Sequence, residues 1–474
     1  MAPIGPAPSS DPFSFDTLHD KDALPISRSN RAIRVDHSGS TPTLRDASPA
    51  PRSASIKLHR VSALARHIHG WSWQAFPVGM GTGAVYVALS ALKHNSPWVY
   101  HLETAFFFLN VALFILNTST LVLQALLYPH QAWRLIKDPS RSVFVPLMVL
   151  SFATVLIGII IYAVPVKRVS PDGVYVLFWI YVGLALLVSF PMLMIWFNQP
   201  HELRMFTPAW AFLIFPMVLS SYHSHDRSSL TSEIQMLVGV VAADVLRVID
   251  PTENRAVGIL VVGYFFQGIG FFMTMFYICI YILRIMITGL LTGSQANTAF
   301  VACGPPGFTG YALINLGLQA REILPAHNLV SPLAGEVWYA AGVLCGTLLF
   351  GFAVFLFVFG ILPYFWKLHT HLNEILGCWA LTFPNVGWIS TLRALGDALD
   401  IPAFYVLHEI MATILCLTWL VLFALTLYAF YRGEIFFAKP EDVLRDETHT
   451  HVHFHIWRGP PPGHPGAPDA ARSV

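Results

Sequence analysis

The chain has 474 residues, of which 55% are hydrophobic and only 12% are charged. This composition excludes an ordinary water-soluble globular domain and is typical of an integral membrane protein. The formal net charge of +1 offers no basic surface for nucleic acid, so we expect neither DNA nor RNA as a partner.

The first 70 residues are rich in Ser, Pro, Asp and Arg and contain no long apolar run. Such a segment cannot bury enough apolar surface to offset the entropy lost on ordering. We therefore predict a disordered cytosolic tail over 1–70, a membrane domain over 71–432, and a second cytosolic tail over 433–474.

Long apolar runs alternate with short polar links between Trp71 and Tyr431. A helix needs about 20 apolar residues to cross a hydrocarbon core of about 30 Å. By this rule the clear spans cover 73–92, 100–128, 143–164, 174–197, 256–288, 300–323, 335–365, 375–395 and 404–431.

One region does not follow the rule. The apolar runs 207–222 and 236–249 are short, and the polar stretch HSHDRSSLTSEIQ at 223–235 separates them. At 1.5 Å per residue each run reaches only about 21 to 24 Å. We count the two runs as one interrupted fifth crossing, which brings the total to ten. The polar stretch is then an insert, or a gene-model error such as a retained intron.

An even number of crossings places both termini on one side of the membrane. Lys and Arg residues near the spans are more numerous in the tails and even-numbered links than in the other links. The positive-inside rule then places both tails in the cytosol, and we expect a multi-pass protein of the plasma membrane.

Prolines are concentrated in the odd-numbered spans. Phe-Pro pairs place four of them at Pro77, Pro191, Pro216 and Pro384, of which only Pro191 belongs to an even-numbered span. A helix broken by proline needs protein or water to satisfy its backbone, so it belongs inside the protein. This predicts an all-α fold of five helical hairpins around a central pore, with kinked odd-numbered helices inside. The alternative is that membrane helices are generally rich in Pro, and that Pro146 and Pro305 lie in first helical turns.

Charged residues are nearly absent from the middle of the spans; Asp244, for example, lies near a span end. A path without Lys or Arg attracts an anion by dipoles, which helix N-termini at Pro and Gly breaks supply. Hydroxyl groups such as those of Thr82 and Thr382 add donors. The pattern therefore favours an anionic solute.

Five motifs occur in order: FPVGMGTG at 76–83, TPAW at 207–210, QGIGF at 267–271, GPPGFT at 304–309 and WALTFPNVGW at 379–388. Together they resemble the tellurite-resistance/dicarboxylate transporter family, which includes plant slow-type anion channels, fungal malate permeases and fungal sulfite efflux pumps. The resemblance covers about residues 71 to 432. The insert 223–235 has no counterpart in the family pattern.

The resemblance implies a ten-helix protomer that assembles as a homotrimer, with one pore in each protomer. It also implies that Phe383 plugs the pore, and it singles out the GPPG start of span seven at Gly304, Pro305 and Pro306. The pore-lining and helix-breaking positions that we expect are Pro77, Gly79, Gly81, Thr82, Gly83, Pro216, Thr382, Pro384, Asn385 and Gly387.

The run of Phe383, Pro384, Asn385, Gly387 and Trp388 is more similar to the malate permease branch than to the sulfite branch. We therefore expect a plasma-membrane transporter of malate and other C4-dicarboxylates. The alternative is a sulfite efflux pump or inorganic-anion channel of the same fold. The sequence leaves open whether the protein is a channel or a proton-coupled carrier.

No convergent group of His, Asp, Cys or Ser at membrane depth suggests an enzyme. The five cysteines lack the paired spacing of a disulfide framework or zinc site, and we expect no cofactor. Four histidines alternate in the C-terminal tail at His449, His451, His453 and His455. We interpret them as part of an unstructured tail rather than as a metal site.

Overall fold

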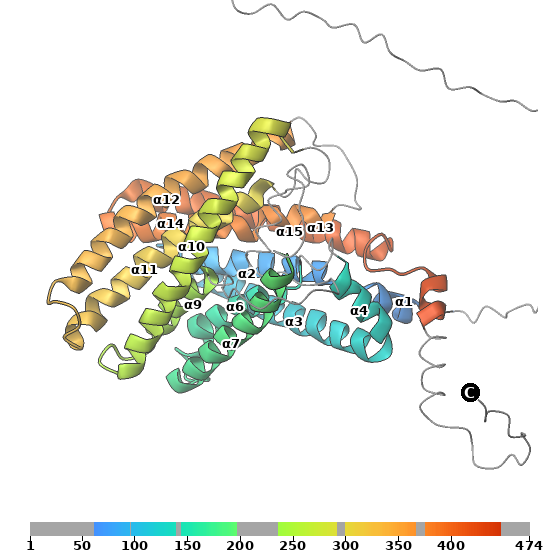
Figure 1. The fold of residues 1–474 in the computed structure, drawn as a ribbon, viewed down its shortest axis with the longest axis horizontal. Coiled ribbons are helices and arrows are strands. Elements are labelled where there is room, and N and C mark those ends of the chain that lie inside the picture. Colours follow the sequence, from blue (N-terminus) through green and yellow to red (C-terminus); the bar gives the residue numbers. More distant parts are fainter. Residues whose placement is uncertain are drawn as a thin grey trace, which may run out of the picture. The chain divides into compact units, whose positions relative to one another are not determined.

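The computed structural model describes residues 61–94, 96–138, 144–196, 236–291, 299–365 and 375–446, which all belong to a compact unit that begins at His59. Across these ranges every regular element is a helix (Figure 1), as the sequence predicts. Several predicted features lie outside the described residues: Pro216, the TPAW motif, the insert 223–235, residues 1–60, and the histidines from His449 to His455.

The helices follow the predicted spans closely. In chain order they are α1 (Ala63–Gly70), α2 (Phe76–Ser90), α3 (Pro97–Leu127), α4 (Pro129–Lys137), α6 (Leu147–Gly158), α7 (Pro171–Trp196), α9 (Met236–Leu246), α10 (Asn254–Thr288), α11 (Gly304–Ala326), α12 (Ala334–Phe365), α13 (Ile375–Cys378), α14 (Phe383–Leu399) and α15 (Pro402–Tyr431). Short 3-10 turns precede α2 (η1, Trp73–Ala75) and α14 (η7, Trp379–Leu381), and a π-helical turn (η2, Ile159–Ala163) follows α6.

Six segments of the described chain are long and apolar enough to cross a membrane. They are Pro97–Leu127, Pro171–Val188, Asn254–Thr288, Ala334–Ile361, Ile375–Leu399 and Pro402–Tyr431, and shorter apolar helices cover Leu147–Ala163 and Leu237–Leu246. This confirms a multi-pass membrane protein. Helix α2 has only 15 residues and reaches about 22 Å, which is less than the hydrocarbon core of a bilayer.

Five helices that are not consecutive in the chain contact one another in a closed ring. Helix α2 contacts α6 and α14, α9 contacts α6 and α11, and α11 contacts α14 (Figure 1). Each remaining long helix packs on the ring helix that precedes it: α3 on α2, α7 on α6, α10 on α9, α12 on α11 and α15 on α14. The ring and its outer layer are thus built from consecutive helix pairs.

Burial separates the two layers. The apolar window of Ile375–Leu399 in the ring is 72% buried, whereas the windows in α3, α12 and α15 are each 28% buried. Large apolar side chains such as Leu126 on α3 and Met286 on α10 are exposed. Exposed apolar surface of this extent matches the hydrocarbon of a bilayer, so the outer helices form the lipid-facing layer.

The structure corrects the predicted position of the prolines. Pro77 and Pro384 lie in the first turns of α2 and α14, not in the middle of kinked helices. Proline suits a first turn because no intrahelical hydrogen bond is lost there. Upstream of Pro384 the apolar segment is interrupted by η7 and by Thr382, whose φ of −101° and ψ of −82° are not helical. New helices therefore begin inside the apolar segments.

Helix α1 lies within the segment that the sequence analysis assigned to the N-terminal tail. Its ordering comes from long-range contacts with the C-terminal segment 434–446. Arg66 Nε donates to Ala438 O at 2.8 Å, and Ala438 N–H donates back to Arg66 O at 3.1 Å. His69 Nε2 lies 2.9 Å from Asp446 Oδ2. A local composition rule cannot anticipate partners nearly 400 residues away.

Candidate functional site

A cavity of about 270 Å³ lies within the helix ring, and residues from all five ring helices line it. Because each ring helix contributes lining residues, the cavity is formed by the ring as a whole and not by a single pair of helices. Its lining includes Gly83 on α2, Thr154 on α6, Asp244 on α9, Phe308 and Tyr311 on α11, and Phe383 and Ser390 on α14. We call it the outer cavity.

A second cavity of about 50 Å³ lies on the other side of Phe383, and we call it the inner cavity. Pro77, Leu147, Val301 and Pro384 line it together with Phe383. These residues lie at or just before the starts of α2, α6, α11 and α14. The residues that line this small space are all apolar.

Phe383 is thus the residue that the two cavities share. It is the first residue of α14, and only 7% of its surface is exposed. Its ring packs against the ring of Phe308 from α11, with centroids 5.0 Å apart. Phe383, the residue predicted as a gate, therefore lines both cavities.

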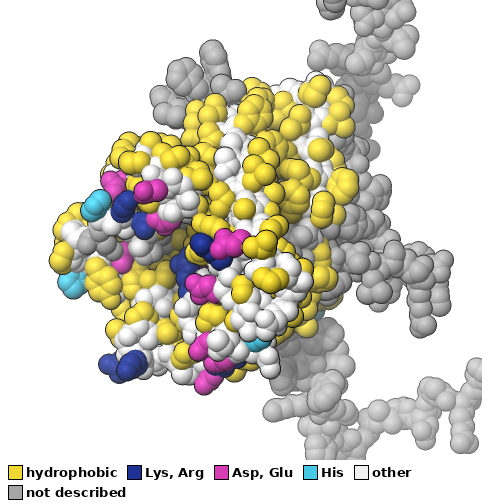
Figure 2. All heavy atoms as spheres, turned by 90° about the vertical axis from the view of Figure 1, so that its left-hand side faces the viewer, with side chains coloured by type: hydrophobic (Ala, Val, Ile, Leu, Met, Phe, Trp, Pro, Cys, Tyr) yellow, Lys and Arg dark blue, Asp and Glu magenta, His cyan; other side chains and the backbone are white. Residues whose placement is uncertain are grey.

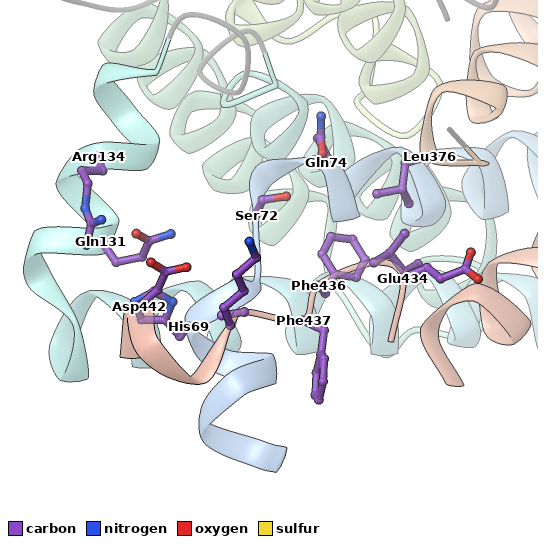
Figure 3. Close-up of a pocket in the computed structure, with 14 residues that line it drawn as sticks. His69, Ser72, Gln74, Gln131, Arg134, Leu376, Glu434, Phe436, Phe437 and Asp442 are labelled. Atoms are coloured by element: carbon purple, nitrogen blue, oxygen red, sulfur yellow. The ribbon is translucent and has the colours of Figure 1, made fainter. Parts of the chain in front are cut away.

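A third cavity of about 430 Å³ lies beside the terminal segments (Figure 3). His69, Gln131, Arg134, Phe436 and Asp442 are among its lining residues, and Figure 3 shows that they come from α1, α4 and the C-terminal segment. Leu376 of α13 lines both this cavity and the inner cavity. The inner cavity therefore shares one lining residue with each of the other two, Leu376 with the third cavity and Phe383 with the outer cavity.

Three of the predicted glycines lie at close helix contacts. Gly83 lines the outer cavity, and a Cβ there would lie 2.8 Å from Thr154 Cβ. A Cβ at Gly81 would lie 2.5 Å from Thr382 Oγ1, and a Cβ at Gly387 would lie 2.7 Å from the backbone nitrogen of Phe308. A Cβ at Gly79 would be 3.4 Å from Ser151 Oγ, an ordinary contact. Gly81 and Gly387 thus permit close helix packing around Phe383.

The predicted hydroxyl donors are already occupied by protein partners. Thr82 Oγ1 donates to Val78 O at 2.8 Å and accepts from Trp419 Nε1–H at 3.0 Å. Thr382 Oγ1 donates to Trp379 O at 2.7 Å, and both threonines are fully buried. In this structure these hydroxyls hold the ring to its outer layer and to η7, instead of facing a solute.

Asn385 is also a structural residue in this arrangement. Its Nδ2 donates to Leu381 O at 2.8 Å, and its Oδ1 accepts from Trp388 Nε1–H at 2.9 Å. Across the interface, Gly304 comes close to Pro384, because a Cβ on Gly304 would lie 3.2 Å from Pro384 Cα. The starts of α11 and α14, with Pro305 and Pro306 buried in the first turn of α11, are therefore held together next to Phe383.

The sequence profile described as "Voltage-dependent anion channel" matches residues 70–427. The chain belongs to the voltage-dependent anion channel family. The resemblance predicted from the five motifs is thereby confirmed. The family consists of transporters and channels rather than enzymes, so this chain is an anion transporter or channel of the membrane.

Relatives in the family have two kinds of names. The sulfite efflux pumps of Trichophyton rubrum and Arthroderma benhamiae are each 25% identical to this chain over 376 residues, which cover 79% of this chain and 93% of theirs. The malic acid transport protein of Schizosaccharomyces pombe is 24% identical over 386 residues, covering 80% of this chain and 83% of its own. Identities this similar do not separate the two substrates.

Two charged residues that the sequence analysis did not propose as site residues line the outer cavity: Asp244 and Arg247. Arg247 Nη2 donates to Asn315 Oδ1 at 2.9 Å and lies 3.4 Å from the hydroxyl of Tyr311. Its Nη1 lies 3.4 Å from Asp244 Oδ1. From the sequence we expect a path without Lys or Arg, whereas this cavity has an arginine in its lining. Arg247 follows the last residue of α9, and only the packing of α9 against α11 turns it toward the cavity.

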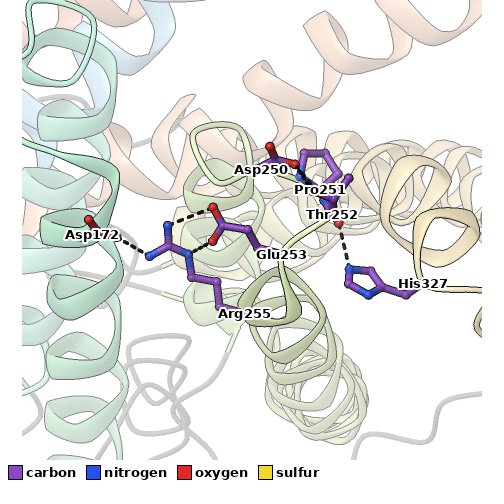
Figure 4. Close-up of polar contacts among 7 residues, drawn as sticks. All are labelled: Asp172, Asp250, Pro251, Thr252, Glu253, Arg255 and His327. Atoms are coloured by element: carbon purple, nitrogen blue, oxygen red, sulfur yellow. Dashed lines mark hydrogen bonds and ion pairs between the residues drawn. The ribbon is translucent and has the colours of Figure 1, made fainter.

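Charged side chains gather at the end of the molecule where α9 is followed by α10 (Figure 2). The connection between these helices is tied to two neighbours (Figure 4). Arg255 pairs with Glu253 and with Asp172 of α7, and His327 Nε2 lies 3.1 Å from Pro251 O. These contacts fix the connection next to Arg247.

The same connection contains a local turn at Asp250. Its Oδ1 accepts from the Thr252 backbone N–H at 2.9 Å and from the Thr252 hydroxyl at 2.7 Å. These hydrogen bonds lower the pKa of Asp250 from its ordinary value, because they favour the charged carboxylate. The connection that follows Arg247 therefore keeps a negative charge at Asp250.

Proposed function

We propose that the helix ring encloses a path for small anions and that the chain crosses the plasma membrane ten times, as five hairpins with the ring helices inside. The consecutive helix pairs support this arrangement, since each ring helix packs on the helix that follows it in the chain. The three cavities, which share the lining residues Leu376 and Phe383, support a path that passes them in this order.

Phe383 is the gate of this path. The observation that carries the proposal is that its side chain lines both the outer and the inner cavity. A rotation of the ring about its side-chain torsions would join the two spaces without moving any helix. Proline at the next position and the close contacts at Gly81 and Gly387 hold the backbone around the ring, so the gate is one side chain on a rigid support.

The substrate is malate or another C4-dicarboxylate. Two observations support this choice: the FPN sequence at Phe383 resembles the malate branch, and a relative covered over 83% of its length is named a malic acid transport protein. The outer cavity of about 270 Å³ suits a small anion that keeps part of its water.

Sulfite is the second candidate. It is favoured by the relatives named sulfite efflux pumps, of whose length the match covers 93%. An outer cavity with one arginine and several hydroxyl-bearing residues also suits a small inorganic oxyanion.

Uptake into proteoliposomes distinguishes the candidates. Labelled malate is the probe, unlabelled sulfite, succinate, nitrate and chloride are competitors, and potassium with valinomycin clamps the voltage. Saturable malate uptake that succinate inhibits more than sulfite supports a dicarboxylate transporter. Sulfite uptake without malate uptake would replace the first candidate by the second, and uptake of neither would contradict both.

We further propose that both termini face the cytosol and that three copies assemble into a homotrimer. The orientation is tested by placing a cysteine in each terminal segment and labelling it with a thiol reagent, once in intact cells and once after permeabilisation. Labelling of intact cells at either terminus would contradict it. Mass measurement of the purified protein in detergent tests the trimer.

A further inference from the structure

We propose that Arg247 is the residue that binds the anion in the outer cavity, recognising a carboxylate or another oxyanion. This inference rests on the proposed anion path and adds a binding residue to it. Arg247 lies just beyond the end of α9 and lines the cavity. Its side chain is 45% exposed, so a solute that enters from the charged end of the molecule can reach it.

Three neighbours hold the guanidinium group in place. Asn315 Oδ1 accepts from Nη2 at 2.9 Å, and Asn315 is itself held by its Nδ2, which donates to Tyr311 O at 2.8 Å. Tyr311 and Asp244 complete the set at 3.4 Å each. These contacts involve only the two terminal nitrogens, and a guanidinium has five N–H donors. Donors are thus left for an oxyanion on the cavity side.

Three other arginines at this end of the molecule are more tightly paired. Arg321 Nε lies 2.6 Å from Glu336, Arg393 Nε lies 2.8 Å from Asp397, and Arg255 binds two carboxylates. Arg393 also donates to Ala91 O at 2.7 Å. Arg247, with its carboxylate at 3.4 Å, is the arginine of this group that lines the cavity and has the weakest ion pair. An incoming anion therefore gains most at Arg247.

Asp244 gives the site a second property. Its carboxylate is almost fully buried beside Arg247 in the cavity wall. It competes with a bound anion for the guanidinium and repels that anion, so binding at Arg247 stays moderate. A transport site needs such a balance, because the solute must leave as well as enter. Asp244 thus limits the affinity for the bound anion, and Arg247 selects a negatively charged solute.

Anion-dependent thermal stabilisation of the full chain in detergent tests the site without requiring transport. Malate and sulfite are titrated separately against the wild type, Arg247→Gln, Arg247→Lys and Arg321→Gln. Arg321 is the matched control, because it is an arginine of similar exposure (48%) at the same end, paired with Glu336 and outside the cavity. We expect Arg321→Gln to behave as the wild type.

For Arg247→Gln the anion concentration that gives half of the stabilisation should rise at least about tenfold, since a charge-assisted contact is lost. For Arg247→Lys this concentration should lie between those of the wild type and Arg247→Gln, because lysine keeps the charge but loses the planar guanidinium fork. Asp244→Asn should lower the half-stabilising concentration. That gain in affinity cannot come from misfolding, so it tests the site even if Arg247→Gln does not fold.

Equal titrations of wild type and Arg247→Gln would overturn the inference, as would a wild type that neither anion stabilises. Failure of the proposed function has a different signature. If the liposomes take up neither malate nor sulfite while the stabilisation still depends on Arg247, the anion path is wrong and the binding residue stands.

Discussion

The ring of Phe383 packs on the ring of Phe308, with 5.0 Å between centroids and 32° between planes. The two residues come from different ring helices, α14 and α11, and the close approach of these helices depends on glycine. A Cβ on Gly307 would lie 2.5 Å from the backbone nitrogen of Trp388, and one on Gly387 would lie 2.7 Å from that of Phe308. Phe383 and Phe308 thus form an aromatic pair where α14 and α11 approach each other closely.

Removing the Phe383 ring should open the path. Phe383→Ala joins the outer and inner cavities, so we expect the anion uptake rate to rise severalfold in proteoliposomes. Phe355→Ala is the matched control, because Phe355 is half-exposed on the outer helix α12 and should leave uptake unchanged. Unchanged or reduced uptake by well-folded Phe383→Ala would contradict the gate.

Gly81 should tolerate no side chain. In Gly81→Ala the new methyl group meets Trp379 at 2.6 Å and Thr382 Oγ1 at 2.5 Å, and overpacking of this kind costs about 1–3 kcal/mol. We expect a lower thermal unfolding midpoint in detergent. Gly183→Ala on α7 is the control, since its Cβ meets nothing within 4 Å and alanine favours a helix by about 0.5–1 kcal/mol. Equal midpoints for the two variants would refute the packing role.

Thr82 should contribute to stability rather than to substrate affinity. Thr82→Val keeps the shape but leaves the Trp419 indole N–H without its acceptor, at a cost of about 1–3 kcal/mol. We expect a lower unfolding midpoint and an unchanged KM for uptake. The control is Thr347→Val, because Thr347 is exposed on α12 and bonds to Val343 O of its own helix. A raised KM in Thr82→Val at full stability would restore the predicted role as a pore-lining donor.

The two terminal segments should separate when their ion pair is lost. The side chain of Asp446 is only 4% exposed, and its carboxylate pairs with both His69 and Arg134. In Asp446→Ala both partners lose this carboxylate, and we expect faster protease cleavage after the segment 434–446 and a faster exchange of the amides of α1. Glu441→Gln, at an exposed position of the same segment, should show neither change. Similar protection in both variants would show that the ring stacking of Trp71 on Phe436 suffices.

The sequence by itself determined the membrane class and most helix positions. These follow from a local property, runs of apolar residues long enough to cross a bilayer. That Pro77 and Pro384 begin helices instead of kinking them was decided by the structure. The motif around Phe383 and Pro384 also pointed to the residue that lies between the two cavities.

Only the tertiary structure decided what these residues contact. From the sequence, Thr82 is a possible hydrogen-bond donor to a solute. In the structure its hydroxyl oxygen accepts a hydrogen bond from the indole N–H of Trp419, 337 residues away. Arg247 lies near the end of the apolar run 236–249 in the sequence, yet the packing of α9 on α11 brings it to Asn315 and to the cavity. The physical reason is the same in both cases: hydropathy depends on neighbours along the chain, whereas the partner of a buried polar group depends on which helices meet around the ring.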